Sequence, residues 1–388
     1  MEKEQQQTAI ALLGSTGSIG RQTLEIAENL GLRVLSLSAD TSIALLEEQT
    51  RRFNPLVVAV YDEKSARDFR VRVADLGVKV VSGMDGLIEA ACVDGAQTVV
   101  TAVVGTVGLL PTLAAIKLSR RIALANKETL VCAGELVMRA AKEHGSEIIP
   151  VDSEHSALFQ CLRGENSKSI KKLILTASGG PFRGKVRSEL LGVTPELALR
   201  HPRWNMGKKI SIDSSTLMNK GLEIIEAIHL FDICADKIDV VVHPESIIHS
   251  MVEYSDSSVI AQLSETDMRL PIQYAITYPH RLPSPTPALN FAKLQSLTFQ
   301  APDFDTFPCL ELAIKTSLVS GTACAVLNAA NEAAVQLFLE KKLSFYGIYE
   351  VVKGALENIN NIKNPTLEDI VEASDAAKDF VLKNVLKI

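Results

Sequence analysis

The sequence lacks both paired cysteines and long apolar runs. Its six cysteines are scattered along the chain without a C-x-x-C pair, so neither a disulfide framework nor a zinc site is indicated. No apolar run is long enough to cross a bilayer, and residues 1–7 are polar, without the character of a targeting peptide. These absences predict reduced thiols and a cytoplasmic location, although a trimmed plastid protein would look the same.

The chain also lacks an excess of basic residues. Its formal net charge is -6, which argues against a surface for nucleic acid or membrane. We therefore expect a small-molecule substrate. With 388 residues, the chain is long enough for two or three domains with ample core.

Short apolar segments alternate with helical patterns through the first half of the chain. Strands are expected at residues 10–13, 34–38, 56–60, 78–81, 98–104 and 121–125. Strands that are apolar throughout and separated by helices are typical of a doubly wound parallel sheet. The predicted fold class is α/β, with an N-terminal Rossmann-like domain.

A glycine loop follows the first predicted strand. Gly14, Gly17 and Gly20 have the spacing G-x-x-G-x-x-G, and an amphipathic helix is expected at residues 21–30. Glycines at the first strand-to-helix turn let a pyrophosphate approach the helix N-terminus. This position favours dinucleotide binding, and an ordinary tight turn is the alternative.

Polar residues also follow two other predicted strands. Asp40 ends the second strand, where an acidic side chain commonly bonds the ribose 2′-OH of NAD and repels the 2′-phosphate of NADP. Lys127 is a candidate contact to substrate or nicotinamide, and its neighbours Asn126 and Glu128 are candidates for orienting the cofactor. The alternatives are that Asp40 caps or solvates the next helix, and that Glu128 only begins a helix.

Two acidic clusters predict a metal site. Asp152 and Glu154 follow an apolar segment at 147–151, so on extended chain they would point the same way. A second set recurs at helical spacing on one face that is too polar for a core: Thr216, Asn219, Lys220 and Glu223. Carboxylate oxygens suit Mg²⁺ or Mn²⁺. The alternative is that these groups are solvated or cap helices.

The segment between the clusters adds two candidate ligand contacts. Two glycines after a strand at 172–175, together with Ser178, could cradle an anion. Trp204, the only tryptophan, lies near His201 in a segment rich in proline, glycine and charge. Such a segment is typical of a mobile loop that covers a ligand, although a lone tryptophan is most often a core residue.

Eight motifs in order resemble the 1-deoxy-D-xylulose 5-phosphate reductoisomerase family. They span nearly the whole chain, at residues 14–20, 125–128, 151–155, 177–183, 201–207, 218–223, 243–252 and 328–332. The resemblance implies isomerisation of a phosphorylated ketose and its reduction by NADPH, giving 2-C-methyl-D-erythritol 4-phosphate in the non-mevalonate isoprenoid pathway. It also implies a homodimer.

The resemblance assigns roles to individual residues. Asp152, Glu154 and Glu223 would be ligands of Mg²⁺ or Mn²⁺. The implied catalytic residues are Lys127, Asp152, Glu154, His155 and Glu223. The implied substrate contacts are Ser178, Ser214, Asn219 and Lys220 at the phosphate, and Lys127, Ser153, Glu154, His201, Trp204 and Glu223 elsewhere. The implied cofactor contacts are Thr16, Gly17, Ser18, Ile19, Asp40, Asn126, Glu128, Gly207 and Met268.

One segment departs from the family pattern. After the second strand the family usually has a Gly-Lys-Asn-like run that receives the 2′-phosphate of NADPH, whereas this chain has Ala39, Asp40, Thr41 and Ser42. The cationic contact is missing, although Arg21 or Ser18 could compensate in part. NADPH stays the expected cofactor, with a weakened preference over NADH.

Four segments are expected along the chain. They are a dinucleotide-binding domain at 1–150, a catalytic α+β domain at 151–285, a linker at 286–306 and a helical domain at 307–388. Strands at 238–242 and 257–264 predict a second sheet in the catalytic part. Helices are expected at 310–320, 324–340, 348–358 and 367–386, which suggests a small bundle.

Two other functions share some of these features. A semialdehyde or sugar dehydrogenase would have the glycine loop without needing three carboxylates for a metal, and loss of turnover with EDTA separates the two. A nucleotide-sensing protein would bind cofactor without turnover. The set of Asp152, Glu154, Lys220 and Glu223 argues against it.

Overall fold

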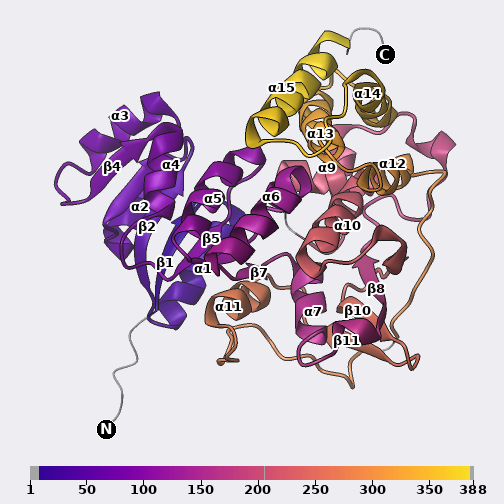
Figure 1. The fold of residues 1–388 in the computed structure, drawn as a ribbon, viewed down its shortest axis with the longest axis horizontal. Helices are drawn as coiled ribbons and strands as arrows, with labels where there is room; N and C mark the ends of the chain where they lie inside the picture. The colour runs from indigo at the N-terminus through magenta and orange to yellow at the C-terminus, as the bar shows by residue number, and fades with distance from the viewer. Residues whose placement is uncertain (1–7, 205, 295, 385–388) are drawn as a thin grey trace. The chain divides into compact units, whose positions relative to one another are not determined.

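The computed structural model describes residues 8–204, 206–294 and 296–384. The chain forms two compact units (Figure 1). The first comprises Met1–Thr129, Val137–Ser156 and Asp267–Pro287, and the second comprises Leu130–Leu136, Ala157–Thr266 and Ala288–Ile388. This division differs from the predicted segments, because residues 267–287 join the first unit and the catalytic and helical segments share the second.

The first unit contains a seven-stranded parallel sheet. Its strands are β1 (Ala9–Leu13), β2 (Arg33–Ala39), β3 (Val57–Val60), β4 (Lys79–Ser82), β5 (Thr98–Thr101), β6 (Arg121–Leu124) and β7 (Ile148–Pro150). The order is β4-β3-β2-β1-β5-β6-β7, and every pair is parallel. The predicted doubly wound α/β fold is confirmed. The strand order reverses at β1, which is where ligands of such sheets bind.

Helices connect these strands. They are α1 (Ser18–Asn29), α2 (Ile43–Phe53), α3 (Glu63–Arg72), α4 (Gly83–Ala91), α5 (Leu109–Lys117) and α6 (Glu128–His144), with α7 (Ser153–Cys161) after β7. A later helix, α11 (Arg269–Thr277), packs against α1, β6 and β7. That packing explains why residues 267–287 belong to this unit rather than to the predicted catalytic segment.

The second unit contains a four-stranded mixed sheet. Its strands are β8 (Ile170–Ala177), β9 (Ile238–Val242), β10 (Ile248–Tyr254) and β11 (Val259–Leu263), in the order β11-β10-β8-β9. β10 runs antiparallel to β8 and β11, and β8 runs parallel to β9. The second sheet was predicted from the segments of β9 and β11. β10 was not predicted as a strand.

Helices complete the second unit. They are α8 (Pro195–Ala198), α9 (Lys208–Thr216), α10 (Met218–Phe231), α12 (Pro308–Ser317), α13 (Ala323–Leu339), α14 (Phe345–Asn358) and α15 (Leu367–Asn384). α13 packs against α12, α14 and α15, and α10 packs against α12. A Cβ on Gly221 of α10 would lie 2.3 Å from Cβ of Ala313, so glycine permits this close approach. The predicted C-terminal helices are confirmed, except that residues 385 and 386 lie outside the described part.

Within the described residues, no helix combines the length and the apolar character needed to cross a bilayer.

Candidate active site

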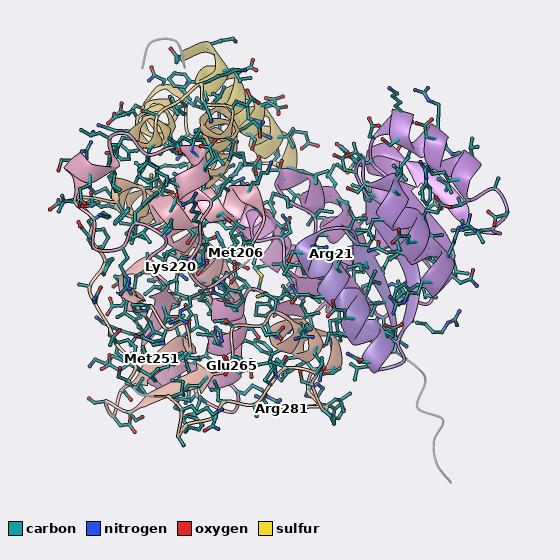
Figure 2. The ribbon with its side chains drawn as sticks, turned by 180° about the vertical axis from the view of Figure 1, so that it is seen from behind. Arg21, Met206, Lys220, Met251, Glu265 and Arg281 are labelled. Carbon is teal, nitrogen blue, oxygen red and sulfur yellow. The ribbon has the colours of Figure 1, made fainter. Side chains whose placement is uncertain are left out.

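The glycine loop lies at the carboxyl edge of the parallel sheet, between β1 and α1. Gly14 has a φ of 82°, and a Cβ there would lie 2.5 Å from the carbonyl oxygen of Ala102. A Cβ on Gly20 would lie 2.2 Å from the Gly14 oxygen, so helix and loop touch backbone to backbone. Among the described residues, no side chain caps the start of α1. Its first N–H groups therefore suit a phosphate. Figure 2 labels Arg21 in the first turns of this helix.

The segment after β6 is held by buried hydrogen bonds. Asn126 Nδ2 donates to the Gly105 carbonyl oxygen at 3.0 Å and to Glu128 Oε2 at 2.8 Å. Thr129 Oγ1 donates to Asn126 Oδ1. Asn126 therefore ties the end of β6 to the loop after β5, which fixes the backbone on either side of Lys127 and Glu128.

Asp152 and Glu154 lie at the start of α7. The strand β7 ends at Pro150 and the helix begins at Ser153, so the predicted extended chain through these residues is wrong. Asp152 instead occupies the position before the helix, and its carbonyl oxygen accepts from Ser156 N at 2.8 Å. The two carboxylates still have oxygens within 4.8 Å of each other, since Asp152 directly precedes α7 and Glu154 lies in its first turn.

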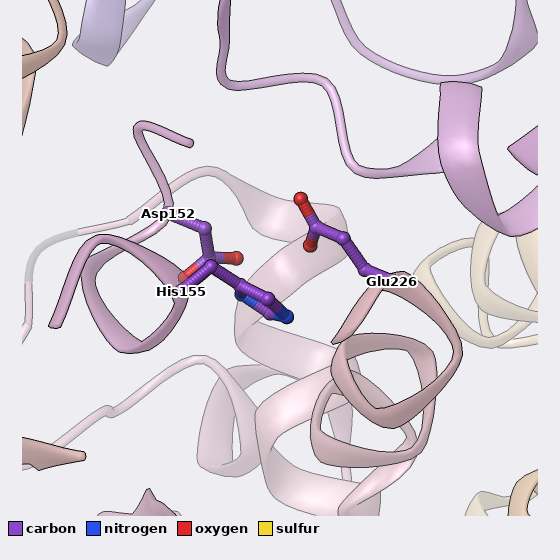
Figure 3. Close-up of side chains that lie close together, drawn as sticks. All are labelled: Asp152, His155 and Glu226. Carbon is purple, nitrogen blue, oxygen red and sulfur yellow. The ribbon is translucent and has the colours of Figure 1, made fainter. Parts of the chain in front are cut away.

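These carboxylates have defined neighbours within the first unit. Lys127 Nζ lies 2.5 Å from Asp152 Oδ2, and both side chains are largely buried. Ser153 Oγ donates to Glu154 Oε2 at 2.7 Å. His155 is fully buried at the same helix start (Figure 3). An ammonium, two carboxylates and an imidazole therefore gather where β6 and β7 end.

The second acidic cluster lies across two helices rather than on one. Leu217 has a φ of 59° and separates α9 from α10, so the expectation that Thr216 shares a helical face with Asn219 and Glu223 is wrong. Thr216 Oγ1 instead accepts from Met218 N at 3.3 Å at the start of α10. Asn219, Lys220 and Glu223 share the predicted polar face, which lies on α10 only.

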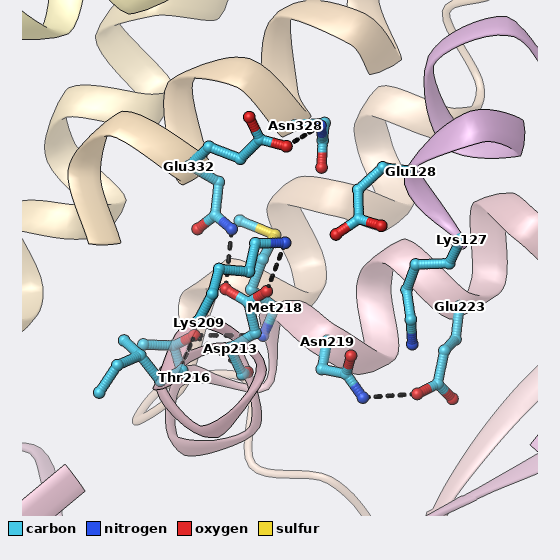
Figure 4. Close-up of polar contacts among 12 residues, drawn as sticks. Lys127, Glu128, Lys209, Asp213, Thr216, Met218, Asn219, Glu223, Asn328 and Glu332 are labelled. Carbon is cyan, nitrogen blue, oxygen red and sulfur yellow. Dashed lines mark hydrogen bonds and ion pairs between the residues drawn. The ribbon is translucent and has the colours of Figure 1, made fainter. Parts of the chain in front are cut away.

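Glu223 is the centre of that face. Asn219 Nδ2 donates to Glu223 Oε1 at 2.5 Å (Figure 4), and Lys220 Nζ forms an ion pair with Glu223 Oε2. The Glu223 and Lys220 side chains are almost completely buried. A buried carboxylate needs such partners, because an uncompensated charge is costly away from water.

A buried polar network that the sequence interpretation missed supports α9. Asp213 pairs with Lys209 at 2.7 Å and accepts from Asn331 Nδ2 of α13 at 2.8 Å (Figure 4). It fastens α9, which carries Ser214, to the C-terminal helices. Asn331 lies in the motif at 328–332 and Asp213 lies just before the motif at 218–223, but nothing in the sequence pairs these two residues, which are 118 positions apart.

The loop after β8 forms a polar pocket with the tryptophan segment. Ser178 Oγ lies 2.9 Å from His201 Nε2, and Trp204 N donates to His201 Nδ1 at 2.9 Å. A cavity of about 370 Å³ is lined here by Ser178, Gly180, Pro181, Arg183, Arg200, Pro202, Arg203 and Pro244. Its three arginines, which the sequence interpretation gave no role, make the pocket positive and suited to an anion.

Two predicted cofactor contacts mark helix starts. Gly207 is the residue before α9, in the second unit. Met268 is the residue before α11, in the first unit. Asp40 is exposed just after β2.

Family models match most of the chain. The model for 1-deoxy-D-xylulose 5-phosphate reductoisomerase matches residues 10–134, the model for its C-terminal domain matches 148–231, and the DXP reductoisomerase C-terminal domain model matches 263–380. A reductoisomerase of that name from Caldanaerobacter subterraneus subsp. tengcongensis is 53% identical over 381 residues, covering 97% of this chain and 99% of that protein.

Solved structures agree over the whole fold. The Zymomonas mobilis reductoisomerase in complex with NADPH is 41% identical, with a TM-score of 0.92, covering 98% of this chain and 100% of that chain. A DOX-P reductoisomerase in complex with NADPH, fosmidomycin and magnesium is 40% identical, with a TM-score of 0.92 and 98% of each chain covered. The chain therefore belongs to the 1-deoxy-D-xylulose 5-phosphate reductoisomerase family and has that family's activity.

Proposed function

We propose that Asp152, Glu154 and Glu223 hold the divalent cation with which this chain converts 1-deoxy-D-xylulose 5-phosphate to 2-C-methyl-D-erythritol 4-phosphate. The observation that carries the proposal is the pair of carboxylates at the start of α7, with oxygens within 4.8 Å of each other and Lys127 beside them. Glu223 of α10 would supply the third carboxylate.

The residues present fit a hard cation. Three carboxylates and nearby hydroxyl groups are the oxygen donors that Mg²⁺ and Mn²⁺ prefer. When bound, such a cation polarises the substrate's carbonyl and adjacent hydroxyl as a Lewis acid. Asn219 and Lys220 hold Glu223 in place, and Lys127 holds Asp152. Ser153, which bonds Glu154, would contact the reacting end, beside His155.

The substrate phosphate would bind to Ser178, Ser214, Asn219 and Lys220. The positive pocket beside Ser178 supports this assignment, since hydroxyl and cationic donors match a phosphate dianion. His201, bonded to Ser178, would contact the substrate on its other side. Trp204, whose backbone is held by His201, would cover the carbon skeleton and keep water away.

NADPH would bind along the carboxyl edge of the parallel sheet. The loop residues Thr16, Gly17, Ser18 and Ile19 would receive its pyrophosphate at the start of α1. The nicotinamide end would lie against Asn126 and Glu128, with Gly207 and Met268 lining it. The strand reversal at β1 supports this placement.

The metal site can be tested without measuring turnover. Glu223→Gln keeps the size of the side chain and removes its charge. Its affinity for Mn²⁺, measured by titration calorimetry, should fall by more than about 100-fold, which exceeds the effect of losing a residue that only hydrogen-bonds a metal ligand. Cofactor binding and the circular dichroism spectrum should not change. The matched control is Glu311→Gln, an exposed glutamate of α12. Equal Mn²⁺ affinity in the parent and Glu223→Gln would remove Glu223 from the metal site.

In the same proposal the chain is a cytoplasmic homodimer. The described cysteines are all free thiols, which suits a reducing compartment. Light scattering after size exclusion should give twice the chain mass of 42.0 kDa. A mass equal to one chain at micromolar concentration would contradict the dimer.

A further inference from the structure

We infer that Asp40 weakens the usual discrimination against NADH, so that this chain prefers NADPH over NADH by less than about tenfold. The inference rests on the proposed placement of the cofactor along the β1–α1 loop. Asp40 follows β2, the parallel neighbour of β1, so both strands end at the same edge of the sheet. An acidic side chain at this position accepts a hydrogen bond from the adenosine ribose 2′-OH.

Backbone contacts fix Asp40 relative to the glycine loop. Ser15 N donates to the Ser38 carbonyl oxygen at 2.8 Å, and Gly14 N donates to Ser38 Oγ at 2.9 Å. Tyr61 N, after β3, donates to the Ala39 carbonyl oxygen at 2.9 Å. The end of β2 is therefore held on both sides, and Asp40 follows it directly.

Asp40 has no structural task in the described part of the chain. The residue before α2 is Ser42, so Asp40 does not cap that helix. Its carboxylate is exposed and has no hydrogen-bond or ion-pair partner among the described residues. The alternative of a helix cap therefore fails, and the charged group is available to a ligand.

The next loop along the edge supplies no excess of positive charge for a phosphate. It contributes two acidic residues, Asp62 and Glu63, and two basic residues, Lys64 and Arg67. The arginines of α2 lie in its last turn, at the other end of the helix, where Arg51 pairs with Asp75 and Arg52 with Glu28.

A 2′-phosphate carries close to two negative charges and would meet the Asp40 carboxylate. NADH lacks that phosphate and instead offers a hydroxyl donor. Arg21, labelled in Figure 2, is exposed on α1 and is a cation that could offset the repulsion.

Initial rates with the full chain, substrate and Mg²⁺ test the inference. The ratio of kcat/KM for NADPH to kcat/KM for NADH should be below about ten. A tenfold ratio corresponds to the smallest contribution expected from about one hydrogen bond to a charged group. Asp40→Asn keeps the shape and removes the charge, so this ratio should rise by about tenfold or more. The matched control, Asp94→Asn, makes the same change before β5 at the opposite edge of the sheet and should leave the ratio unchanged. A parent ratio above ten, or a ratio unmoved in Asp40→Asn, overturns the inference.

Binding of NADPH and NADH, followed by quenching of Trp204 fluorescence, separates this inference from the proposed function. Comparable affinities support the role of Asp40, and a much tighter NADPH complex overturns it while leaving the proposed function intact. In Arg21→Gln, NADPH binding should weaken and NADH binding should not change, because Arg21 offsets the repulsion between Asp40 and the 2′-phosphate. If the parent binds NADPH much more tightly than NADH and loses that preference in Arg21→Gln, the inference is overturned.

Discussion

Single residues set the chemical character of the candidate site, where three carboxylates each pair with a lysine. Lys127 pairs with Asp152, Lys220 pairs with Glu223, and Lys209 pairs with Asp213. Each pairing offsets the cost of placing a carboxylate away from water. Asp152 and Glu223, two of the three proposed metal ligands, are therefore held in place by these partners.

The cysteines offer a test of burial at single residues. Burial raises the pKa of Cys309 to about 12 and that of Cys161 to about 11, so neither forms much thiolate near neutral pH. Cys234 is exposed. Iodoacetamide at pH 8 should therefore modify Cys234 first, with Cys309 reacting only after denaturation, as measured by peptide mass spectrometry. Rapid modification of Cys309 in the native protein would contradict its burial.

At the scale of helices and strands, the glycine loop packs closely against the start of α1. Gly20→Ala adds a Cβ that would lie 2.2 Å from the Gly14 oxygen and 2.6 Å from the Ser15 backbone. It should cost about 1–3 kcal/mol of unfolding free energy, as overpacking does, and weaken cofactor binding. Gly77→Ala is the control, since a Cβ there meets nothing within 4 Å. Denaturant unfolding compares the two, and equal stabilities would show that the loop and helix are not in contact.

Most elements could be predicted from the sequence because their signals are local. Most strands of the parallel sheet have apolar centres, and the buried strands β1 and β5 can be recognised without knowledge of their neighbours. The glycine loop can be recognised from the spacing of its glycines and from its position after the first strand. The helices α12 to α15 follow their apolar periodicity closely.

The errors arose where local signals were ambiguous. Leu217 adopts a left-handed conformation that a leucine rarely takes, so a break between α9 and α10 had no sequence signal. Asp152 did have one, because aspartate favours the position before a helix, but the preceding strand suggested continued extension. The Asp213–Asn331 contact depends on packing of α9 against α13, which spacing cannot reveal.

At the scale of the whole molecule, the chain divides differently from its sequence order. Residues 267–287, which include Met268 and α11, belong to the first unit although they follow residues 157–266 of the second unit in the sequence. The interval from Tyr278 to Phe307 contains no helix or strand among its described residues, apart from a bridge between Gln300 and Val242. Such a route is consistent with the predicted linker, whose boundaries stay a prediction.

Metal-dependent reductoisomerisation by this chain can be measured in a single assay. Absorbance of the reduced nicotinamide is followed with purified protein and 1-deoxy-D-xylulose 5-phosphate, with Mg²⁺ or with EDTA. We predict oxidation of the cofactor with Mg²⁺, its loss with EDTA and its recovery when Mg²⁺ is restored in excess. Oxidation that persists unchanged in EDTA, or no oxidation under any condition, would contradict the account.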